Sequence, residues 1–197
     1  MTLFARHSEV KPGQRLINNT HLLELLKPTG SLRKIAQAFI GEKAMPVRAL
    51  LFDKTEQTNW SLGWHQDRTV AVKERINVTG FGHWSLKEGI HHVEPPSEIL
   101  SRMITLRAHL DDCGEENEPL LVAPGSHKLG RVPVNQVNDF VQKHGCFSCL
   151  AKAGDVWVYS SLVLHASEAA KAPSHRRVLH VDFAAEKLPG GLEWLGI

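Results

Sequence analysis

The sequence has few cysteines, a single tyrosine, no long hydrophobic run and no excess of charge of one sign. Three cysteines in 197 residues are an odd number, which fits a reducing compartment and argues against a disulfide framework. No apolar stretch reaches membrane-spanning length, and the first thirty residues lack the pattern of a secretory signal. Lys and Arg number 23 against 21 Asp and Glu, so nucleic-acid binding is not indicated. We therefore expect a cytoplasmic protein that binds neither membranes nor nucleic acid.

The composition that remains is that of an ordinary globular domain. Hydrophobic residues make up 42% of the chain and charged residues 22%, close to the averages for folded domains. A chain of this length buries roughly 70% of the surface that its unfolded form exposes. We predict a single domain over residues 1–197, with a helical N-terminal segment over 1–45 and a β-rich core over 47–184. The sequence leaves the oligomeric state open.

Three helices are predicted from apolar periodicity and end signals. The run HLLELL follows Asn19 and ends before Pro28, and the run LRKIAQAFI follows Ser31 as its cap and ends at Gly41. A third helix is expected over 134–145, where VNQVNDFVQKHG has a helical period. These helices flank the core.

The core is predicted to consist of strands. Runs rich in Val, Leu and Ile are separated by Gly, Pro, Asn and Asp: VRALLF, RMITLRAHL, PLLVAPG, DVWVYSSLVLH and RVLHVDFA. They do not alternate regularly with helices, which favours a sandwich or barrel over a doubly wound sheet. We predict a mainly β fold with flanking helices, a double-stranded β-helix (jelly-roll, cupin-like) barrel. Residues 77–96 have no clear periodicity and are expected to form a loop that covers a site.

Histidine is the one residue type in unusual abundance, with twelve in the chain. Strand residues i and i+2 project from the same face, so His-x-Asp or His-x-Glu presents two metal ligands side by side. Such pairs occur at His65/Asp67, His109/Asp111, His180/Asp182, His7/Glu9 and His92/Glu94. The pair at 65 and 67 follows a strand in a polar stretch, where the rim of a concave site is expected. The pair at 109 and 111 competes with it, and the pair at 180 and 182 is expected to be the polar face of a terminal strand.

Four segments of the core follow one pattern. They are WHQD at 64–67, LDDCGEENEPLLVAPGSH at 110–127, GDVWVYSSLVLHAS at 154–167 and HRRVLHVDFA at 175–184. In order and spacing they resemble the phytanoyl-CoA dioxygenase-like family of iron(II)- and 2-oxoglutarate-dependent oxygenases, although Glu118 stands where that family usually has Gly. The resemblance implies His65, Asp67 and His165 as the metal ligands. It places the competing pair at 109 and 111 on the strand before the second segment.

The resemblance also implies a reaction. Two His and one carboxylate occupy one face of octahedral Fe(II) and leave three positions open. By resemblance, 2-oxoglutarate fills two of these and O2 takes the third, and oxidative decarboxylation to succinate and CO2 accompanies hydroxylation of a small or medium-sized organic molecule. Halogenating relatives replace the carboxylate ligand with a small residue, so the presence of Asp67 favours a hydroxylase.

The far carboxylate of 2-oxoglutarate requires a fixed cation, and Arg offers two parallel hydrogen bonds. The resemblance places this anchor at Arg176, eleven residues after His165. Arg177 is the alternative, because a slip of one residue exchanges the two faces of a strand. Lys54 is a second candidate for the same carboxylate.

Three further residues are candidates for contact with the substrate. Arg107 lies on the polar face of RMITLRAHL, Trp157 shares an expected strand face with His165, and His127 ends the PGSH turn. Two other functions stay open at this point. One is a cupin-like metal protein that uses zinc or manganese for hydrolysis or isomerisation, and the other is a non-catalytic binding module on the same barrel.

Overall fold

The computed structural model describes residues 13–17 and 19–197. Its helices are α1 (Thr20–Leu26), α2 (Ser31–Ile40), α3 (Ser97–Ser101) and α4 (Val137–His144), with 3-10 turns at Glu56–Thr58, Glu115–Asn117, Ser126–Leu129 and Val134–Gln136. Its strands are β1 (Gly13–Arg15), β2 (Met45–Lys54), β3 (Leu62–His65), β4 (Val70–Val72), β5 (Gly82–Lys87), β6 (Ile90–Glu94), β7 (Ile104–His109), β8 (Leu120–Ala123), β9 (Phe147–Cys149), β10 (Val156–Ser160), β11 (Leu164–Ser167) and β12 (Arg176–Ala184). Within the described part of the chain, no helix is both long and apolar enough to cross a membrane.

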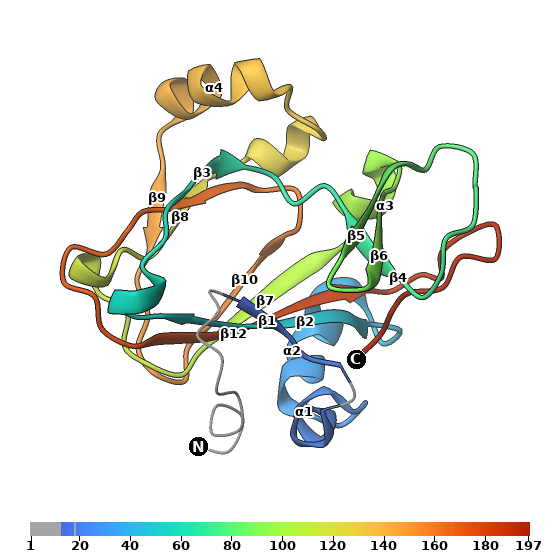
Figure 1. Cartoon of the computed structure of the whole chain (residues 1–197), viewed down its shortest axis with the longest axis horizontal. Helices are drawn as coiled ribbons and strands as arrows, with labels where there is room; N and C mark the ends of the chain where they lie inside the picture. Colours follow the sequence, from blue (N-terminus) through green and yellow to red (C-terminus); the bar gives the residue numbers. More distant parts are fainter. Residues whose placement is uncertain (1–12, 18) are drawn as a thin grey trace.

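The strands form three antiparallel sheets. Their orders are β1-β2-β12-β7-β10, β3-β11-β8-β9 and β4-β6-β5. In Figure 1 the five-stranded and four-stranded sheets lie opposite each other, with α1 and α2 below the first and α4 above the second. The three-stranded sheet lies at one end. The prediction of a mainly β, jelly-roll fold with flanking helices is confirmed.

The helix ends lie close to the predicted positions. The side chain of Asn19 accepts hydrogen bonds from the backbone N–H groups of His21 and Leu22, which caps α1. The predicted cap of α2 is wrong by one residue, because Gly30 occupies the cap position and Ser31 is the first helical residue. Gly41 ends α2 at φ +87°, a conformation that glycine adopts without steric cost.

The five-stranded sheet has one apolar face and one polar face. Its outer face packs against α1 and α2 through Ala49, Leu51, Leu106, Leu179, Val181 and Phe183, with Leu22, Leu26, Leu32 and Ala36 from the helices. Its inner face carries buried polar side chains, among them Lys54, Thr105, Arg107, His109, Arg176, His180 and Asp182. The main hydrophobic core therefore lies between sheet and helices, whereas the space between the two large sheets is polar and highly charged.

The segment predicted as one strand over 155–165 is two strands in different sheets. β10 pairs with β7 in the five-stranded sheet, and β11 pairs with β3 and β8 in the four-stranded sheet. A turn in which the N–H of Val163 donates to the carbonyl of Ser160 carries the chain from one sheet to the other. Trp157 and His165 consequently do not share a strand face.

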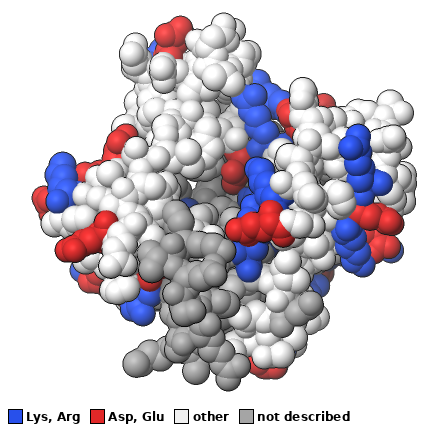
Figure 2. All heavy atoms as spheres, viewed as in Figure 1, with Lys and Arg blue, Asp and Glu red and all other residues white. Residues whose placement is uncertain are grey.

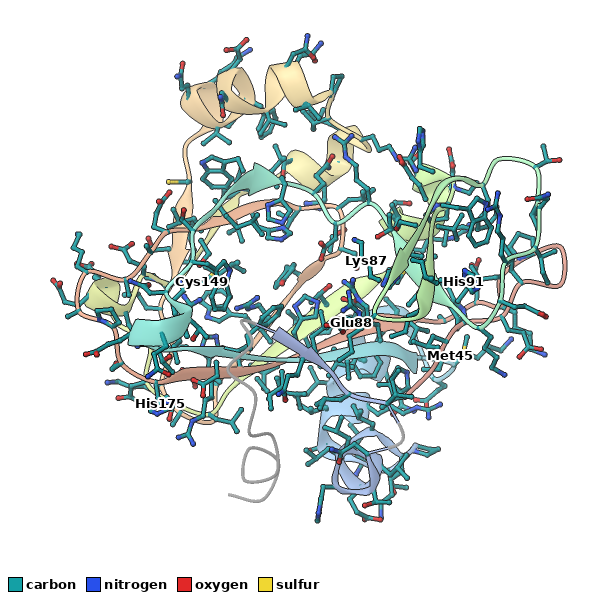
Figure 3. The ribbon with its side chains drawn as sticks, in the orientation of Figure 1. Met45, Lys87, Glu88, His91, Cys149 and His175 are labelled. Atoms are coloured by element: carbon teal, nitrogen blue, oxygen red, sulfur yellow. The ribbon has the colours of Figure 1, made fainter. Side chains whose placement is uncertain are left out.

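The loop expected over 77–96 is wrong in its second half, which forms the β5–β6 hairpin. Its two-residue turn consists of Glu88 and Gly89, both at positive φ, as a type I′ turn requires. His92 on β6 is fully buried. Glu88 forms an ion pair of 2.7 Å with Arg15, and in Figure 3 it lies at the hairpin end nearest the five-stranded sheet.

Candidate metal centre

Three predicted ligands converge between the two large sheets. His65 on β3 and His165 on β11 are direct cross-strand partners, and their ring centroids are 4.2 Å apart. Asp67 follows β3 by two residues, and one ligand atom from each of the three side chains lies within 4.8 Å of the other two. The pair His7/Glu9 lies outside the described residues.

Backbone carbonyls fix the orientation of both imidazoles. Nδ1 of His65 lies 2.7 Å from the carbonyl oxygen of Gly63, and Nδ1 of His165 lies 3.0 Å from that of Val163. A carbonyl oxygen only accepts, so each Nδ1 carries the proton and donates it. Each Nε2 therefore keeps its lone pair for a metal ion, the usual arrangement of histidine ligands. This donor set of two imidazole nitrogens and a carboxylate fits Fe(II).

The protonation states of the ligands also suit a cation. Burial lowers the pKa of His165 to about 4, so this imidazole is neutral at pH 7. Burial raises the pKa of Asp67, but the positive charge of Arg48, and that of His165 in its protonated form, outweigh burial and hold this pKa below its ordinary value. Metal binding requires both the neutral imidazole and the ionised carboxylate.

Behind Asp67 lies a network of buried polar groups. Nη2 of Arg48 is 3.4 Å from Oδ2 of Asp67, and Nε of Arg48 is 2.5 Å from Oδ2 of Asp182. The other oxygen of Asp182 accepts from Thr105 at 2.8 Å and lies 3.1 Å from Nε2 of His180. Burial opposes ionisation of Asp182, but Arg48 and His180 keep its pKa below the ordinary value. Arg48 thus connects a candidate ligand to a fixed buried anion.

The three candidate ligands line a cavity of about 120 Å³ between the two large sheets. Its polar lining, besides the ligands, consists of Arg48, Arg107, Ser167, Arg176 and His180, and its apolar lining of Leu50, Phe52, Trp60, Leu62, Leu120 and Ala166. Figure 2 shows Lys, Arg, Asp and Glu side chains along one side of a central hollow on this face. The cavity therefore combines a wall of candidate metal ligands, a cationic wall and an apolar remainder.

Arg176 and Lys54 meet at one hydroxyl group beside this cavity. Nη2 of Arg176 is 3.4 Å from Oγ of Ser167, and Nζ of Lys54 is 3.3 Å from the same oxygen. Arg176 also donates to the backbone carbonyl of Glu118, and Lys54 to that of Glu168. Among the described residues, neither cation forms an ion pair with a carboxylate. Burial and then Arg176 lower the pKa of Lys54 to about 8.

The alternative anchor lies on the other face of β12. Arg177 forms a bidentate pair with Asp111: its Nε lies 2.8 Å from Oδ2 of Asp111, and its Nη2 lies 2.5 Å from Oδ1. This contact also separates Asp111 from His109, whose side chain is buried on the inner face. The pair at 109 and 111 therefore does not converge as two metal ligands.

The three residues predicted to contact the substrate have different positions. Arg107 lines the cavity and is 8% exposed. Trp157 donates its indole N–H to the carbonyl of Leu150 at 3.0 Å and packs against Phe147, outside the set of lining residues. His127, in the 3-10 turn after β8, also lies outside that set.

Two residues of the site were missed by the sequence analysis. Ser167 lies two residues after His165 on β11, a spacing that could have predicted a shared face. Arg48 lies on the same face of β2 as Lys54, and the alternation of VRALLFDK could have indicated it. No sequence signal predicts that Arg48 contacts Asp182, 134 residues away.

Comparisons with known proteins agree with this geometry. The family model described as phytanoyl-CoA dioxygenase matches residues 2–178. A search of curated proteins found no match. Solved structures with a similar fold include EvdMO1 (24% identity, TM-score 0.57, covering 81% of this chain and 30% of that chain) and AviO1 from Streptomyces viridochromogenes (25%, 0.56, 81% and 59%). EctD from S. alaskensis, in a structure with 2-oxoglutarate and 5-hydroxyectoine, is 17% identical with a TM-score of 0.55 (86% and 57%). The chain thus spans less than two thirds of each of these proteins.

Proposed function

Because this chain belongs to the phytanoyl-CoA dioxygenase family, we propose that it is an Fe(II)- and 2-oxoglutarate-dependent dioxygenase that hydroxylates a small or medium-sized organic molecule, with release of succinate and CO2. Family membership and fold support a dioxygenase-type function. The observation that carries the proposal is the pairing, in one cavity, of the His65, Asp67 and His165 ligand set with the cation Arg176, which has no carboxylate partner among the described residues. EctD, which has a similar fold, binds 2-oxoglutarate in its crystal structure.

In this proposal each residue has a defined task. His65 and His165 present Nε2 to the metal ion, and Asp67 supplies a carboxylate oxygen. Arg176, with Lys54 and Ser167, binds the distal carboxylate of 2-oxoglutarate through charge-assisted hydrogen bonds. When bound, the iron activates O2 for oxidation of the two organic molecules.

The polar network and the cavity walls support this chemistry. Arg48 holds Asp67 in its ionised form and fixed orientation. The apolar part of the lining excludes water from the space beside the ligands, which prevents side reactions of the activated site. Asp67 would occupy the metal position that becomes free for a halide when a small residue replaces the carboxylate ligand. Hydroxylation is therefore the proposed outcome rather than halogenation.

Anaerobic addition of Fe(II) and then 2-oxoglutarate tests the proposal. Bidentate binding of 2-oxoglutarate to Fe(II) should give a weak visible charge-transfer band in the wild-type protein, and Asp67→Ala should lose it. Asp111→Ala is the matched control, since Asp111 also belongs to a His-x-Asp tripeptide but pairs with Arg177 outside the cavity. This variant should keep the band.

Calorimetry with 2-oxoglutarate separates the remaining alternatives. A cupin-like hydrolase or isomerase has no need of 2-oxoglutarate and would not bind it, whereas the proposed enzyme binds it in the presence of Fe(II). A non-catalytic module would form no succinate with any organic molecule tested. Folded, iron-loaded protein that shows neither the band nor 2-oxoglutarate binding would contradict the proposal.

A further inference from the structure

From the distribution of charge in the cavity we infer that the substrate is a small apolar molecule carrying a carboxylate, and that Arg107 binds this carboxylate. The inference rests on the proposed function, because it assigns Arg176 and Lys54 to 2-oxoglutarate. It extends that function from an unspecified organic molecule to a chemical class. Four features of Arg107 and its surroundings lead to it.

The first feature is that Arg107 is a buried cation without a counter-ion. It is 92% buried, lines the cavity, and forms no ion pair with any carboxylate of the described residues. Its Nε is buried and has no hydrogen-bond partner among those residues. Burying a charge without a partner costs several kcal/mol or more, by order of magnitude. Such a side chain is explained when a bound ligand supplies the partner.

The second feature is the way in which aromatic rings hold the cations. The guanidinium of Arg107 lies 5.6 Å from the ring centroid of Phe52, and Nζ of Lys54 lies 5.2 Å from that of Trp60. The two rings are themselves neighbours, with centroids 6.2 Å apart. Cation–π contacts stabilise a charge without using its N–H donors. Apart from its contact with the Tyr159 hydroxyl, the guanidinium of Arg107 therefore keeps N–H groups available for an anion.

The third feature is the distance of Arg107 from the anchor of 2-oxoglutarate. On the inner face Arg107 is the cross-strand partner of His180, which lies four residues along β12 from Arg176. At strand spacing this is about 13 Å. The guanidinium stays near its own row, between Phe52 on one side and Tyr159 on the other. Arg107 thus starts from a different row of the sheet than Arg176, although the two guanidinium groups are near enough for Arg107 to lower the pKa of Arg176.

The fourth feature is the charge balance with both cofactors bound. The charge of Fe(II) equals that of the 2-oxoglutarate dianion, so these two cancel. Asp67 then offsets one of the three cations Lys54, Arg107 and Arg176, since Arg48 pairs with Asp182, Lys171 pairs with Glu118, and Glu168 is exposed to solvent. Even with Lys54 deprotonated, as its pKa of about 8 allows, one positive charge has no counter-charge. A substrate carboxylate supplies the missing negative charge.

The remaining lining defines the rest of the substrate. Leu50, Phe52 and Leu62 line the cavity together with other apolar side chains, and they offer no hydrogen bond to a polar group. An apolar body therefore suits this space better than a sugar or a nucleotide. The planar guanidinium matches a carboxylate with two parallel N–H donors.

Calorimetry on the complex with Fe(II) and saturating 2-oxoglutarate, kept anaerobic, tests the inference. The probes are apolar monocarboxylates from butyrate to 3-phenylpropionate, each matched with its primary amide of equal shape. We expect at least one acid to bind roughly tenfold or more tightly than its amide, because a carboxylate adds to the hydrogen bonds a charge–charge attraction to the guanidinium that a neutral amide lacks. Arg107→Met should abolish this preference and Arg107→Lys should keep part of it, while 2-oxoglutarate affinity changes less than threefold. Arg177→Met, on the same sheet but facing outward, should leave the preference unchanged.

Two results would overturn the inference. In one, no acid binds the wild-type complex more tightly than its amide, whether through equal affinity or through absence of binding. In the other, Arg107→Met weakens 2-oxoglutarate binding tenfold or more, which makes Arg107 a second anchor for the co-substrate. The charge-transfer band of the same samples keeps the two proposals separate. If the band forms and the acid preference is absent, only the substrate class is wrong, and if the band itself is missing, the proposed function fails.

Discussion

At the scale of single residues, the ionisation of Lys54 should make 2-oxoglutarate binding depend on pH. The groups that face it are Arg176 from β12, Ser167 at the end of β11, Glu168 after it, Glu118 before β8, and the thiol of Cys113. Burial and Arg176 lower the pKa of Lys54 to about 8, so the ammonium is present at pH 7 and is lost above pH 8. Affinity for 2-oxoglutarate should therefore be highest below pH 8. It should weaken by about tenfold towards pH 9, because a hydrogen bond to a charged group is lost.

Calorimetry of 2-oxoglutarate binding at pH 7, 8 and 9 measures this effect. Lys54→Met should bind more weakly at pH 7 and show little change with pH. Lys73→Met is a matched control, because Lys73 is exposed and pairs with Glu193 away from the cavity. Equal wild-type affinity at pH 7 and pH 9 would contradict the role given to Lys54.

Arg48 and Asp182 should affect the metal without touching it. Arg48→Met leaves the carboxylate of Asp182 buried without its arginine partner, and loss of one partner of such a pair costs about 3–5 kcal/mol of folding free energy. The double variant Arg48→Met/Asp182→Asn removes both charges and should recover most of that stability. Its Fe(II) affinity should still be about 10–100-fold weaker, the usual effect of removing an outer-shell partner.

Denaturation midpoints and Fe(II) titrations of the two variants distinguish positioning from folding. Arg48→Lys, which keeps the charge but not the forked geometry, should restore part of the affinity. If the double variant is stable and binds Fe(II) as tightly as the wild-type protein, Arg48 does not position Asp67.

At the scale of elements, the junction of α1 and α2 depends on one glycine. A Cβ atom on Gly30 would lie 2.3 Å from the backbone carbonyl oxygen of Leu25. Gly30→Ala should therefore lower the free energy of unfolding by about 1–3 kcal/mol, the range for overpacked sites. Gly114→Ala is the control, since its Cβ would meet nothing within 4 Å, and it should change stability little. Equal midpoints for both variants in urea would contradict this packing.

The elements also show what the sequence could predict. The two short helices, the strand texture after Val47 and the alternation of RMITLRAHL follow from local periodicity, and the structure agrees with them. The β5–β6 hairpin was missed because its turn uses Glu88-Gly89 rather than the familiar Asn-Gly or Asp-Gly pair. The division between β10 and β11 was missed because both halves are apolar, and only pairing with other strands separates them.

The candidate site, like the fold, could be predicted from the sequence only in part. The spacing of the four matching segments was sufficient to nominate His65, Asp67 and His165, which the fold then brings together. Strand alternation could have indicated Arg48 and Ser167, but it cannot show that Arg48 contacts Asp182, because that contact depends on the pairing of β2 with β12. Arg176 and Arg177 differ in strand phase: Arg177 pairs with Asp111, whereas Arg176 lines the cavity, and its role as the anchor stays a prediction.

At the scale of the whole molecule, binding of metal and co-substrate should stabilise the fold. The candidate ligands lie on β11 and on or directly after β3, whereas the cations lie on β2, β7 and β12. A bound metal and co-substrate therefore connect both large sheets. At ligand concentrations 100-fold above Kd the gain is about 2.7 kcal/mol, which corresponds to a rise of roughly 5–10 °C in Tm for a protein of this size. Anaerobic calorimetric scans with Fe(II) and 2-oxoglutarate measure the rise. Asp67→Ala should show none, and an equal rise in that variant would place the stabilising site elsewhere.

The most direct measurement is a crystal structure grown anaerobically with Fe(II) and 2-oxoglutarate, in which anomalous scattering locates the iron. We predict one peak within coordination distance of Nε2 of His65, Nε2 of His165 and a carboxylate oxygen of Asp67, with the distal carboxylate of 2-oxoglutarate on Arg176. An iron peak at other residues, or 2-oxoglutarate bound away from Arg176, would contradict it.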